Sequence, residues 1–410
     1  MSRKIDIGMC LRRSAIGLAL FVFLAIALWL NLSVRTEQQF SLLAQSFLHG
    51  RLDFVGPPSG IWDDTTPYRD AHYWPLGPFP AVLLMPFQFV AGLSGKIFYQ
   101  GYLQILLVVA VVFLGFRIAR QIGYDREDAI YAAFGFTFAS AFLGVALWPW
   151  SWYFSQVVTG VALFAAIFEM AGQRRAWLIG LLFAICLATR ATAALGIIWF
   201  IGEVLFIREV SLPQKLRSIG LAILPCAIVF LLLLLYNYAR FENPFEQGYA
   251  NQIIPETAAA ARNVGVLSLH HLPANLYAMF FASPVPVLRP DGSPVLTFPF
   301  FAANPWGMGV FVTAPWLLCV FGLRYRDTTS RLILLTVIMI ALPILLYYAV
   351  GYRQFGYRYS LDFLPFIWFA MLRNYREQRG GLSVTLKIAI VISAIWDFNL
   401  FAGHYLRHLT

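Results

Sequence analysis

Residues 177–207 read WLIGLLFAICLATRATAALGIIWFIGEVLFI, an apolar run of 31 residues with Arg190 near its centre. A helix of about 20 apolar residues crosses a bilayer, so this run is too long for one span and too short for two full ones. A guanidinium at membrane depth costs about 2.5 to 3.5 kcal/mol on insertion scales, which favours a position facing a cavity or an anion. We therefore expect a hairpin of two short helices with its apex near Thr189 and Arg190. The alternative for Arg190 is snorkelling, or pairing with a carbonyl at a helix end.

The composition of the whole chain is that of a polytopic membrane protein. Its 410 residues are 60% hydrophobic and 12% charged, with a mean hydropathy of +0.70. Soluble domains are about 25% charged, so these residues cannot cover a water-facing surface of this size. The net charge of +10 therefore does not indicate nucleic-acid binding, and no P-loop or Rossmann fingerprint indicates a nucleotide site. The cysteines, which lie in or beside apolar runs without zinc-site or disulfide spacing, are Cys10, Cys186, Cys226 and Cys319.

Further apolar runs are long enough to cross the membrane, beginning with 15–32, which follows basic residues and lacks a signal-peptide cleavage site. Residues 79–94 are short and interrupted by Pro80 and Pro86, so we expect them to dip into the bilayer and return. The remaining predicted spans are 101–118, 129–147, 154–171, 218–238, 308–323, 332–350, 361–372 and 384–403.

Basic residues between the predicted spans set the orientation, because the positive-inside rule places such clusters in the cytoplasm. The N-terminus is then cytoplasmic, and segments 33–79, 239–307 and 351–360 lie outside. We expect one transmembrane domain over residues 1–410, with a first outer loop at 33–79, a large outer loop at 239–307 and no separate soluble domain. The expected location is a bacterial inner membrane. The clusters are Arg117/Arg120/Arg126, Arg174/Arg175, Arg208/Lys215/Arg217, Arg324/Arg326/Arg331 and Arg373/Arg376/Arg379.

The first outer segment opens with a pattern that predicts a helix along the membrane surface. Thr36 and Gln39 have the spacing of a capping box, and apolar residues at helical spacing follow it. Glu37 would be the first residue of that helix, near the membrane, where an acid could meet the head of a lipid. Alternatively, its carboxylate complements the helix dipole.

Residues 62–74, WDDTTPYRDAHYW, mix acids with aromatic side chains just before the proline-interrupted segment. Aromatic faces stack on sugar rings and carboxylates accept hydrogen bonds from sugar hydroxyls, so this mixture favours sugar or acceptor binding. Any single acid here could instead be only solvated. The candidate residues are Asp63, Asp64, Asp70, His72, Tyr73 and Trp74.

A second pair of cations lies in the short outer segment GYRQFGYRYSLDFLPF at 351–366. Arg353 and Arg358 stand among tyrosines between two predicted spans, where they could contact an anion. The alternative is an interfacial tyrosine belt in which Arg358 pairs with Asp362 across one helical turn.

Two strings in the first outer loop, AQSFLHGRLDF at 44–54 and YWPLGPFPAVLLMPF at 73–87, follow an acid placed after the first span. In this arrangement the chain resembles the GT-C superfamily of polyprenyl-phosphate-sugar-dependent glycosyltransferases, in the branch of protein O-mannosyltransferases and the aminoarabinose transferase. The resemblance implies an all-α polytopic bundle of roughly 11 to 12 membrane helices with horizontal helices on its outer face. The family loop opens with an Asp-Glu pair, whereas this chain has Thr36-Glu37. The implied base is therefore Glu37, or Asp64 later in the loop.

The resemblance also implies a function for the cations and a reaction. Arg190 and Arg358, with Arg353 nearby, would bind the phosphate of a lipid-linked donor, and the enzyme would transfer a hexosyl or pentosyl group to a glycan, lipid or protein outside. We expect no cofactor and no nucleic-acid partner. No step of this reaction requires a metal ion, and the alternative is a metal ion held by Asp63 and Asp64. Two alternatives are a transporter or flippase of lipid-linked sugars and a non-catalytic subunit of an envelope assembly. The inner halves of the spans are nearly free of ionisable residues, which disfavours a transporter.

Overall fold

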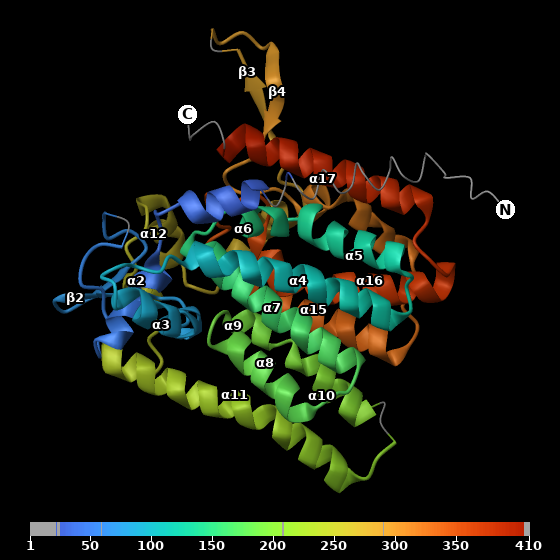
Figure 1. Cartoon of the computed structure of the whole chain (residues 1–410), viewed down its shortest axis with the longest axis horizontal. Helices are drawn as coiled ribbons and strands as arrows, with labels where there is room; N and C mark the ends of the chain where they lie inside the picture. The colour runs from blue at the N-terminus through green and yellow to red at the C-terminus, as the bar shows by residue number, and fades with distance from the viewer. Residues whose placement is uncertain (1–21, 23–24, 59, 207–208, 290, 406–410) are drawn as a thin grey trace.

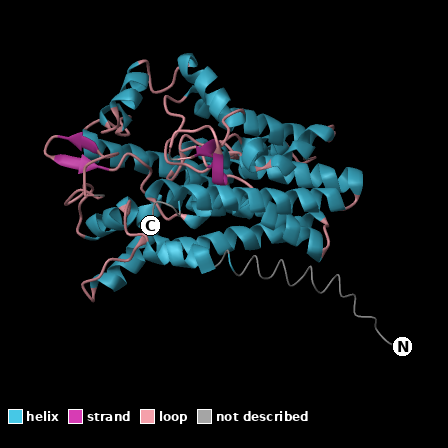
Figure 2. Ribbon diagram, turned by 90° about the horizontal axis from the view of Figure 1, so that it is seen from above, coloured by secondary structure: helices cyan, strands magenta, loops and turns pink. Residues whose placement is uncertain are grey.

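The computed structural model describes residues 22, 25–58, 60–206, 209–289 and 291–405. Residues 25–33 are helical, while Cys10 and half of the predicted span at 15–32 lie outside the described residues. The long helices run side by side between two ends of a bundle (Figures 1 and 2). We call the end at which segments 34–79 and 239–271 gather the loop end. The opposite end, where Arg174, Arg373 and Arg376 meet, is the basic end.

The chain is an all-α polytopic membrane protein. Within the described residues, five helices are long and apolar enough to cross a membrane. They are α4 (Gln100–Ile122), α7 (Ser151–Ala171), α11 (Leu212–Phe241), α15 (Thr328–Leu346) and α17 (Val384–Tyr405). Other predicted spans form shorter or broken helices, and the first predicted span lies only partly within the described residues.

Two predicted spans are interrupted helices. Residues 129–147 form α5 (Arg126–Phe138) and α6 (Phe142–Leu147), and residues 308–323 form α14 (Val310–Thr313) and a 3₁₀ helix, η3 (Pro315–Gly322). At the first break the Trp316 indole donates to the carbonyl of Ala139 over 2.7 Å. A break at membrane depth is tolerated because a neighbouring side chain satisfies the freed carbonyl.

The hairpin predicted in residues 177–207 is confirmed. α8 (Ala176–Leu187) stops just before Thr189, and α9 (Ala191–Ala194) and α10 (Ile197–Phe206) return. α8 also packs closely on α11: a Cβ at Gly180 would lie 2.1 Å from the carbonyl oxygen of Ala222. The hairpin is therefore fixed against a long membrane helix.

Residues 79–94 do not form a segment that enters the bilayer and returns, so that prediction was wrong. They form one helix, α3 (Phe79–Gly92), because Pro80 stands in its first turn, where a proline is tolerated, and Pro86 does not break it. Fourteen residues rise only about 21 Å, too short to cross a bilayer. α3 packs along α2 (Gln39–Leu48) at the loop end (Figure 1).

The predicted capping box is also wrong. α2 begins at Gln39, so Glu37 precedes the helix instead of opening it. The Gln39 amide donates to the Glu37 carboxylate over 2.6 Å and does not bond the backbone of Thr36. Glu37 has a φ of 55°, a left-handed conformation that ends any helical path at this residue. The carboxylate is therefore held in front of the helix by a side chain.

The remaining elements connect the spans. Two small antiparallel sheets pair β1 (Thr66–Tyr68) with β2 (Ala71–Tyr73) and β3 (Val285–Leu288) with β4 (Leu296–Ala302). The other elements are η1 (Tyr249–Asn251), α12 (Glu256–Asn263), η2 (Leu269–His271), α13 (Leu272–Phe280), η4 (Arg358–Asp362) and α16 (Leu364–Arg379).

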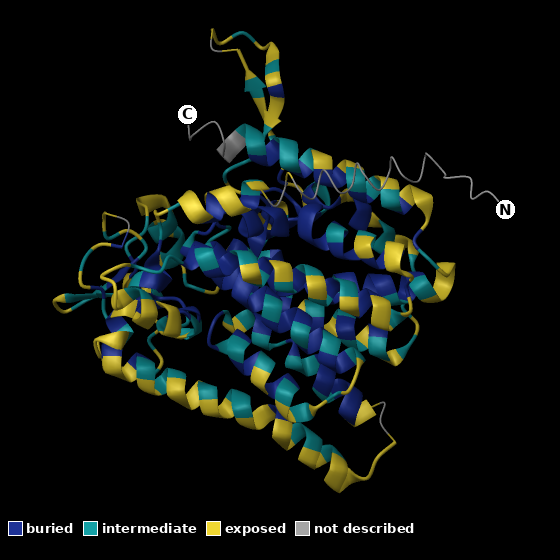
Figure 3. Ribbon diagram, in the orientation of Figure 1, coloured by how far each residue is buried: buried dark blue, intermediate teal, exposed yellow. Residues whose placement is uncertain are grey.

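Burial differs strongly between helices. In the most apolar 18-residue stretch of α7, 78% of the residues are buried, whereas only 6% are buried in that of α11. α7 therefore lies at the centre of the bundle, and α11 lies at its surface, exposed to lipid along its length (Figure 3). A second core lies under the loop end, where Phe40, Trp74 and Phe154 are fully buried. This second core anchors the first outer segment to α7.

Candidate functional site

A cavity of about 490 Å³ opens at the loop end, between α11, the apex after α8 and the last turn of α15. One wall is apolar and includes Phe230, Leu233 and Leu234 of α11. Two arginines, Arg190 and Arg240, line the same cavity. An apolar wall leading to cations is the shape that accommodates an acyl or prenyl chain with an anionic head.

Arg190 has a carboxylate partner, Asp362. Its guanidinium donates to both oxygens of Asp362, with Nε 2.6 Å from Oδ1 and Nη2 3.0 Å from Oδ2. The hydroxyl of Thr192 donates to the same carboxylate. The guanidinium carbon also lies 5.7 Å from the centroid of the Tyr359 ring. Asp362 thus fixes Arg190 at the cavity wall and reduces its net charge.

The sequence alternative that pairs Arg358 with Asp362 is wrong. Both residues belong to η4, a 3₁₀ helix, in which residues four apart point to different faces because there are three residues per turn. Arg358 is only 7% exposed, and its Nε and Nη1 have no hydrogen-bond partner among the described residues. Its guanidinium carbon lies 5.6 Å from the Trp152 ring and 4.9 Å from the Tyr359 ring. Tyr359 therefore lies between Arg358 and Arg190.

Asp64 and Glu37 are neighbours, although 27 positions separate them. Burial and the Glu37 carboxylate raise the pKa of Asp64 to about 6, and the Arg358 guanidinium and a bond from the Trp152 indole oppose that rise. The Asp64 carboxyl is therefore partly protonated at mildly acidic pH. Two carboxylates and one buried guanidinium thus form a single charged cluster.

The backbone holds both carboxylates in a strained conformation. Glu37 and Asp64 have φ values of 55° and 62°, a region that residues other than glycine rarely occupy. The Glu37 carbonyl accepts hydrogen bonds from the amide and hydroxyl of Ser151 and from the Gln100 side chain, over 2.9 to 3.1 Å. The Asp64 carbonyl accepts one from Gln252 over 3.1 Å. Such over-determined strain is concentrated at functional sites.

Two of the expected sugar-binding aromatics have other partners. Trp74 is fully buried between Phe40 and Trp152, with ring centroids 5.9 and 5.0 Å away, so it belongs to the core and offers no face to a sugar. Tyr73 is half-buried and packs edge-on against Phe241 at 5.3 Å. The Trp74 ring thus lies against α7 and the Tyr73 ring against α11.

The other predicted residues lie nearer the surface. Asp63 is exposed beside Asp64, and Asp70 is exposed at the turn between β1 and β2. His72 stacks on Trp62 with ring centroids 3.9 Å apart. Arg353 is exposed, and its carbonyl accepts a bond from the Tyr153 hydroxyl. Of the three predicted donor-binding arginines, only Arg190 lines the cavity. The Arg358 guanidinium nevertheless lies close to that of Arg190, because the two guanidinium carbons are 4.9 and 5.7 Å from the centroid of the same Tyr359 ring.

Sequence reasoning missed Arg240. It is 3% exposed, donates to the Trp74 carbonyl and the Asn237 side chain over 2.7 Å each, and lies 4.0 Å from the Tyr236 ring. Its Nε has no partner among the described residues, and no carboxylate bonds it there. The available signal was an arginine in the last turn of an apolar run, which usually indicates only snorkelling.

The titratable groups also bear on metal binding. No group of three or more His, Cys, Asp and Glu side chains in the described part of the chain is placed to hold a metal ion.

Comparison with known proteins gives one structural similarity. The chain is similar to the crystal structure of the Archaeoglobus fulgidus oligosaccharyltransferase in the apo form, with 16% sequence identity and a TM-score of 0.46. The match covers 93% of this chain and 55% of that chain, so this chain spans about half the length of the oligosaccharyltransferase. No family model and no curated protein sequence matches the chain.

Proposed function

We propose that this protein is a membrane glycosyltransferase that uses a sugar donor carried on a polyprenyl phosphate and acts on the outer face of a bacterial inner membrane. The observation that supports it most is the juxtaposition of a lipid-sized cavity, lined by Arg190 and Arg240, with the strained carboxylates Glu37 and Asp64. Trp152 links the two parts, because it lines the cavity and also bonds Asp64. The loop end is then the outer end, and the basic end is cytoplasmic.

The donor lipid would enter along α11. Phe230, Leu233 and Leu234 would contact the prenyl chain, which suits a helix whose length is open to lipid. The phosphate would lie against Arg240, whose guanidinium is buried without a carboxylate among the described residues, and beside Arg190. An anion there would relieve the cost of a buried unpaired cation.

The transfer step uses the carboxylates. Asp64 or Glu37 removes the proton from an acceptor hydroxyl, the hydroxyl oxygen attacks the anomeric carbon, and the bond from that carbon to the phosphate oxygen breaks. The polyprenyl phosphate leaves with the electron pair of that bond, and the arginines stabilise the added negative charge. Arg358, buried beside Asp64, favours the ionised form of the base.

The test is consumption of the donor. Purified protein in detergent is incubated with radiolabelled polyprenyl-phosphate sugars and cell-envelope extract, and the label is followed into products. Label moving to a glycan, lipid or protein acceptor supports the proposal. A transporter or a non-catalytic subunit would leave every donor intact.

A further inference from the structure

A β-hairpin projects from the side of the bundle. β3 and β4 pair with Val285 opposite Ala302 and Leu288 opposite Leu296. Figures 1 and 2 agree that the hairpin points at right angles to the long helices, on the side of the bundle opposite α11. It is therefore remote from the cavity and has no part in the proposed transfer step.

The base of the hairpin is fixed near the end of α17. A Cβ at Gly403 would lie 2.9 Å from Pro299, and the rings of Phe301 and Trp396 are 6.1 Å apart. α17 starts just after the basic residues of α16 and ends at the loop end. In the orientation of the proposed function, on which this inference rests, the hairpin lies parallel to the outer membrane surface.

The body of the hairpin is apolar and exposed. Leu288, Val295, Leu296 and Phe300 are 45%, 43%, 43% and 50% exposed. Charged side chains occur only at its tip, where Arg289 and Asp291 flank the turn. An apolar sheet of this kind in water would promote association, so it requires a non-aqueous surrounding or a partner.

Two features distinguish lipid from a protein partner. Pro286 in β3 and Pro299 in β4 lack the N–H groups that an added strand would need, which disfavours pairing with another chain at the sheet edges. The neighbouring face of α17 is also apolar and exposed at Ile388, Ile392 and Ile395. The hairpin surface is thus continuous with a surface that faces lipid in any membrane orientation.

The unpaired backbone groups of the hairpin limit how deeply it can enter the membrane. A two-stranded sheet has open edges whose N–H and C=O groups need water, so it cannot enter the hydrocarbon core. We propose that β3 and β4 form an arm that lies in the headgroup region of the outer leaflet, with its apolar side chains at the boundary of the acyl chains. The arm would widen the footprint of the protein on the membrane at the level of the transfer site.

The test measures the surroundings of the arm in a bilayer. Nitroxide spin labels are attached to Leu288→Cys and Val295→Cys in the full chain, reconstituted in phosphatidylcholine–phosphatidylglycerol nanodiscs. Collision with oxygen, which partitions into lipid, is compared with collision with a water-soluble nickel chelate. Ile392→Cys is the lipid-facing control and Asp70→Cys the exposed loop control. The native cysteines are first replaced by alanine: Cys10, Cys186, Cys226 and Cys319.

We expect the ratio of oxygen to nickel collisions at 288 and 295 to be several-fold higher than at 70 and to approach the ratio at 392. A ratio equal to that at 70 would show an arm in water and overturn the proposal. Protection from both reagents, in nanodiscs and in detergent alike, would show a covering protein, such as a second copy of the chain, and would overturn it too. These labels do not report sugar transfer, and a normal ratio at 392 with a water-like ratio at 288 leaves the proposed function standing.

Discussion

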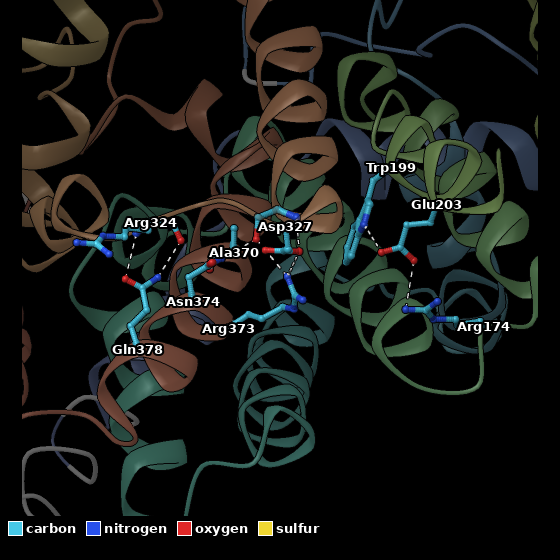
Figure 4. A network of polar contacts seen from close by, with 10 residues as sticks. Arg174, Trp199, Glu203, Arg324, Asp327, Ala370, Arg373, Asn374 and Gln378 are labelled. Carbon is cyan, nitrogen blue, oxygen red and sulfur yellow. Dashed lines mark hydrogen bonds and ion pairs between the residues drawn. The ribbon is translucent and has the colours of Figure 1, made fainter. Parts of the chain in front are cut away.

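Charged side chains cluster at both ends of the bundle. The two ends differ in whether the polar atoms of those side chains have hydrogen-bond partners. At the basic end, Glu203 accepts from Arg174 over 3.2 Å and from the Trp199 indole over 2.9 Å, and Arg373 donates to Asp327 over 2.6 Å (Figure 4). At the loop end, Arg358 and Arg240 each keep a buried nitrogen without a hydrogen-bond partner among the described residues.

We interpret the paired charged groups of the basic end as stabilising the fold, and the unpaired nitrogens of Arg358 and Arg240 as available to bind a ligand. Paired and hydrogen-bonded groups stabilise the state in which they are found, whereas an unpaired buried polar group costs about 1 to 3 kcal/mol. Left-handed φ values occur at both ends, at Glu37 and Asp64 and at Arg174, so the distinction rests on the unpaired nitrogens and not on backbone strain. We interpret the loop end as the reactive end and the basic end as a structural clamp. The following predictions test that division.

The largest expected effect is on turnover when a carboxylate of the loop end is neutralised. Because a general base contributes about 10²- to 10⁴-fold to rate, either Asp64→Asn or Glu37→Gln should lower turnover by that factor and leave donor binding nearly intact. Turnover of a radiolabelled polyprenyl-phosphate sugar identifies the base. Full activity in both variants would remove the acid–base mechanism.

The matched control at the other end is Glu203→Gln. It weakens a buried ion pair, so it should lower thermal stability by about 1 to 3 kcal/mol, while the folded fraction keeps its turnover. Equal losses of turnover at the two ends would abolish the distinction drawn here.

A second prediction concerns the unpaired arginine of the cavity. Hydrogen bonds to charged groups are worth about 1.5 to 3 kcal/mol, so Arg240→Ala should weaken binding of a fluorescent polyprenyl phosphate by about 10- to 100-fold. Arg240→Lys keeps the charge without the two-pronged geometry and should lose less. Arg373→Ala, at the basic end, should bind the lipid normally. Normal binding by Arg240→Ala would place the phosphate elsewhere.

The pH dependence of turnover gives a smaller effect. If Asp64, with its pKa of about 6, is the base, the rate should fall as pH drops through about 6, and at pH 5 it should be about tenfold below its plateau. Arg358→Gln removes a cation that favours the ionised carboxylate, which raises the pKa of Asp64 and should shift the profile to higher pH. A pH profile that is flat from 5 to 8 would exclude Asp64 as the base.

The smallest effect tests how the first outer segment is positioned. A Cβ at Gly77 would lie 2.2 Å from the backbone oxygen of Ala188, at the apex that precedes Arg190. Gly77→Ala should therefore lower the thermal midpoint by an amount equivalent to about 1 to 3 kcal/mol and raise the apparent donor KM. Gly56→Ala meets no atom within 4 Å and should behave as wild type in both assays.

The sequence predicted the class of the protein and the break at Thr189, because both depend on length and hydropathy along the chain. It placed Glu37 inside a helix, since local spacing does not reveal that Gln39 bonds the carboxylate and Ser151 holds the backbone. The pairing of Arg190 with Asp362 was equally hidden, because 172 positions separate them and only the tertiary fold brings the apex after α8 next to η4.

Arg240 and Trp74 also show that a local sequence pattern does not predict burial. The pattern led us to overlook Arg240 as a site residue and to expect Trp74 to be one. An arginine at the end of an apolar run and a tryptophan in a polar loop look like a snorkelling residue and a sugar platform. Burial reverses both interpretations, because Arg240 lines the cavity and Trp74 is fully enclosed. Exposure is a property of tertiary packing, which no local pattern encodes.

The most direct measurement is a structure determined with a non-hydrolysable polyprenyl-phosphonate sugar bound. We expect the phosphonate to lie against Arg240 and Arg190, with the prenyl chain along α11 and the anomeric carbon facing Asp64 and Glu37. Binding of the head group at the basic end, beside Arg174 and Arg376, would contradict the division between a reactive end and a structural end. So would a sugar bound on a side of the bundle away from both carboxylates.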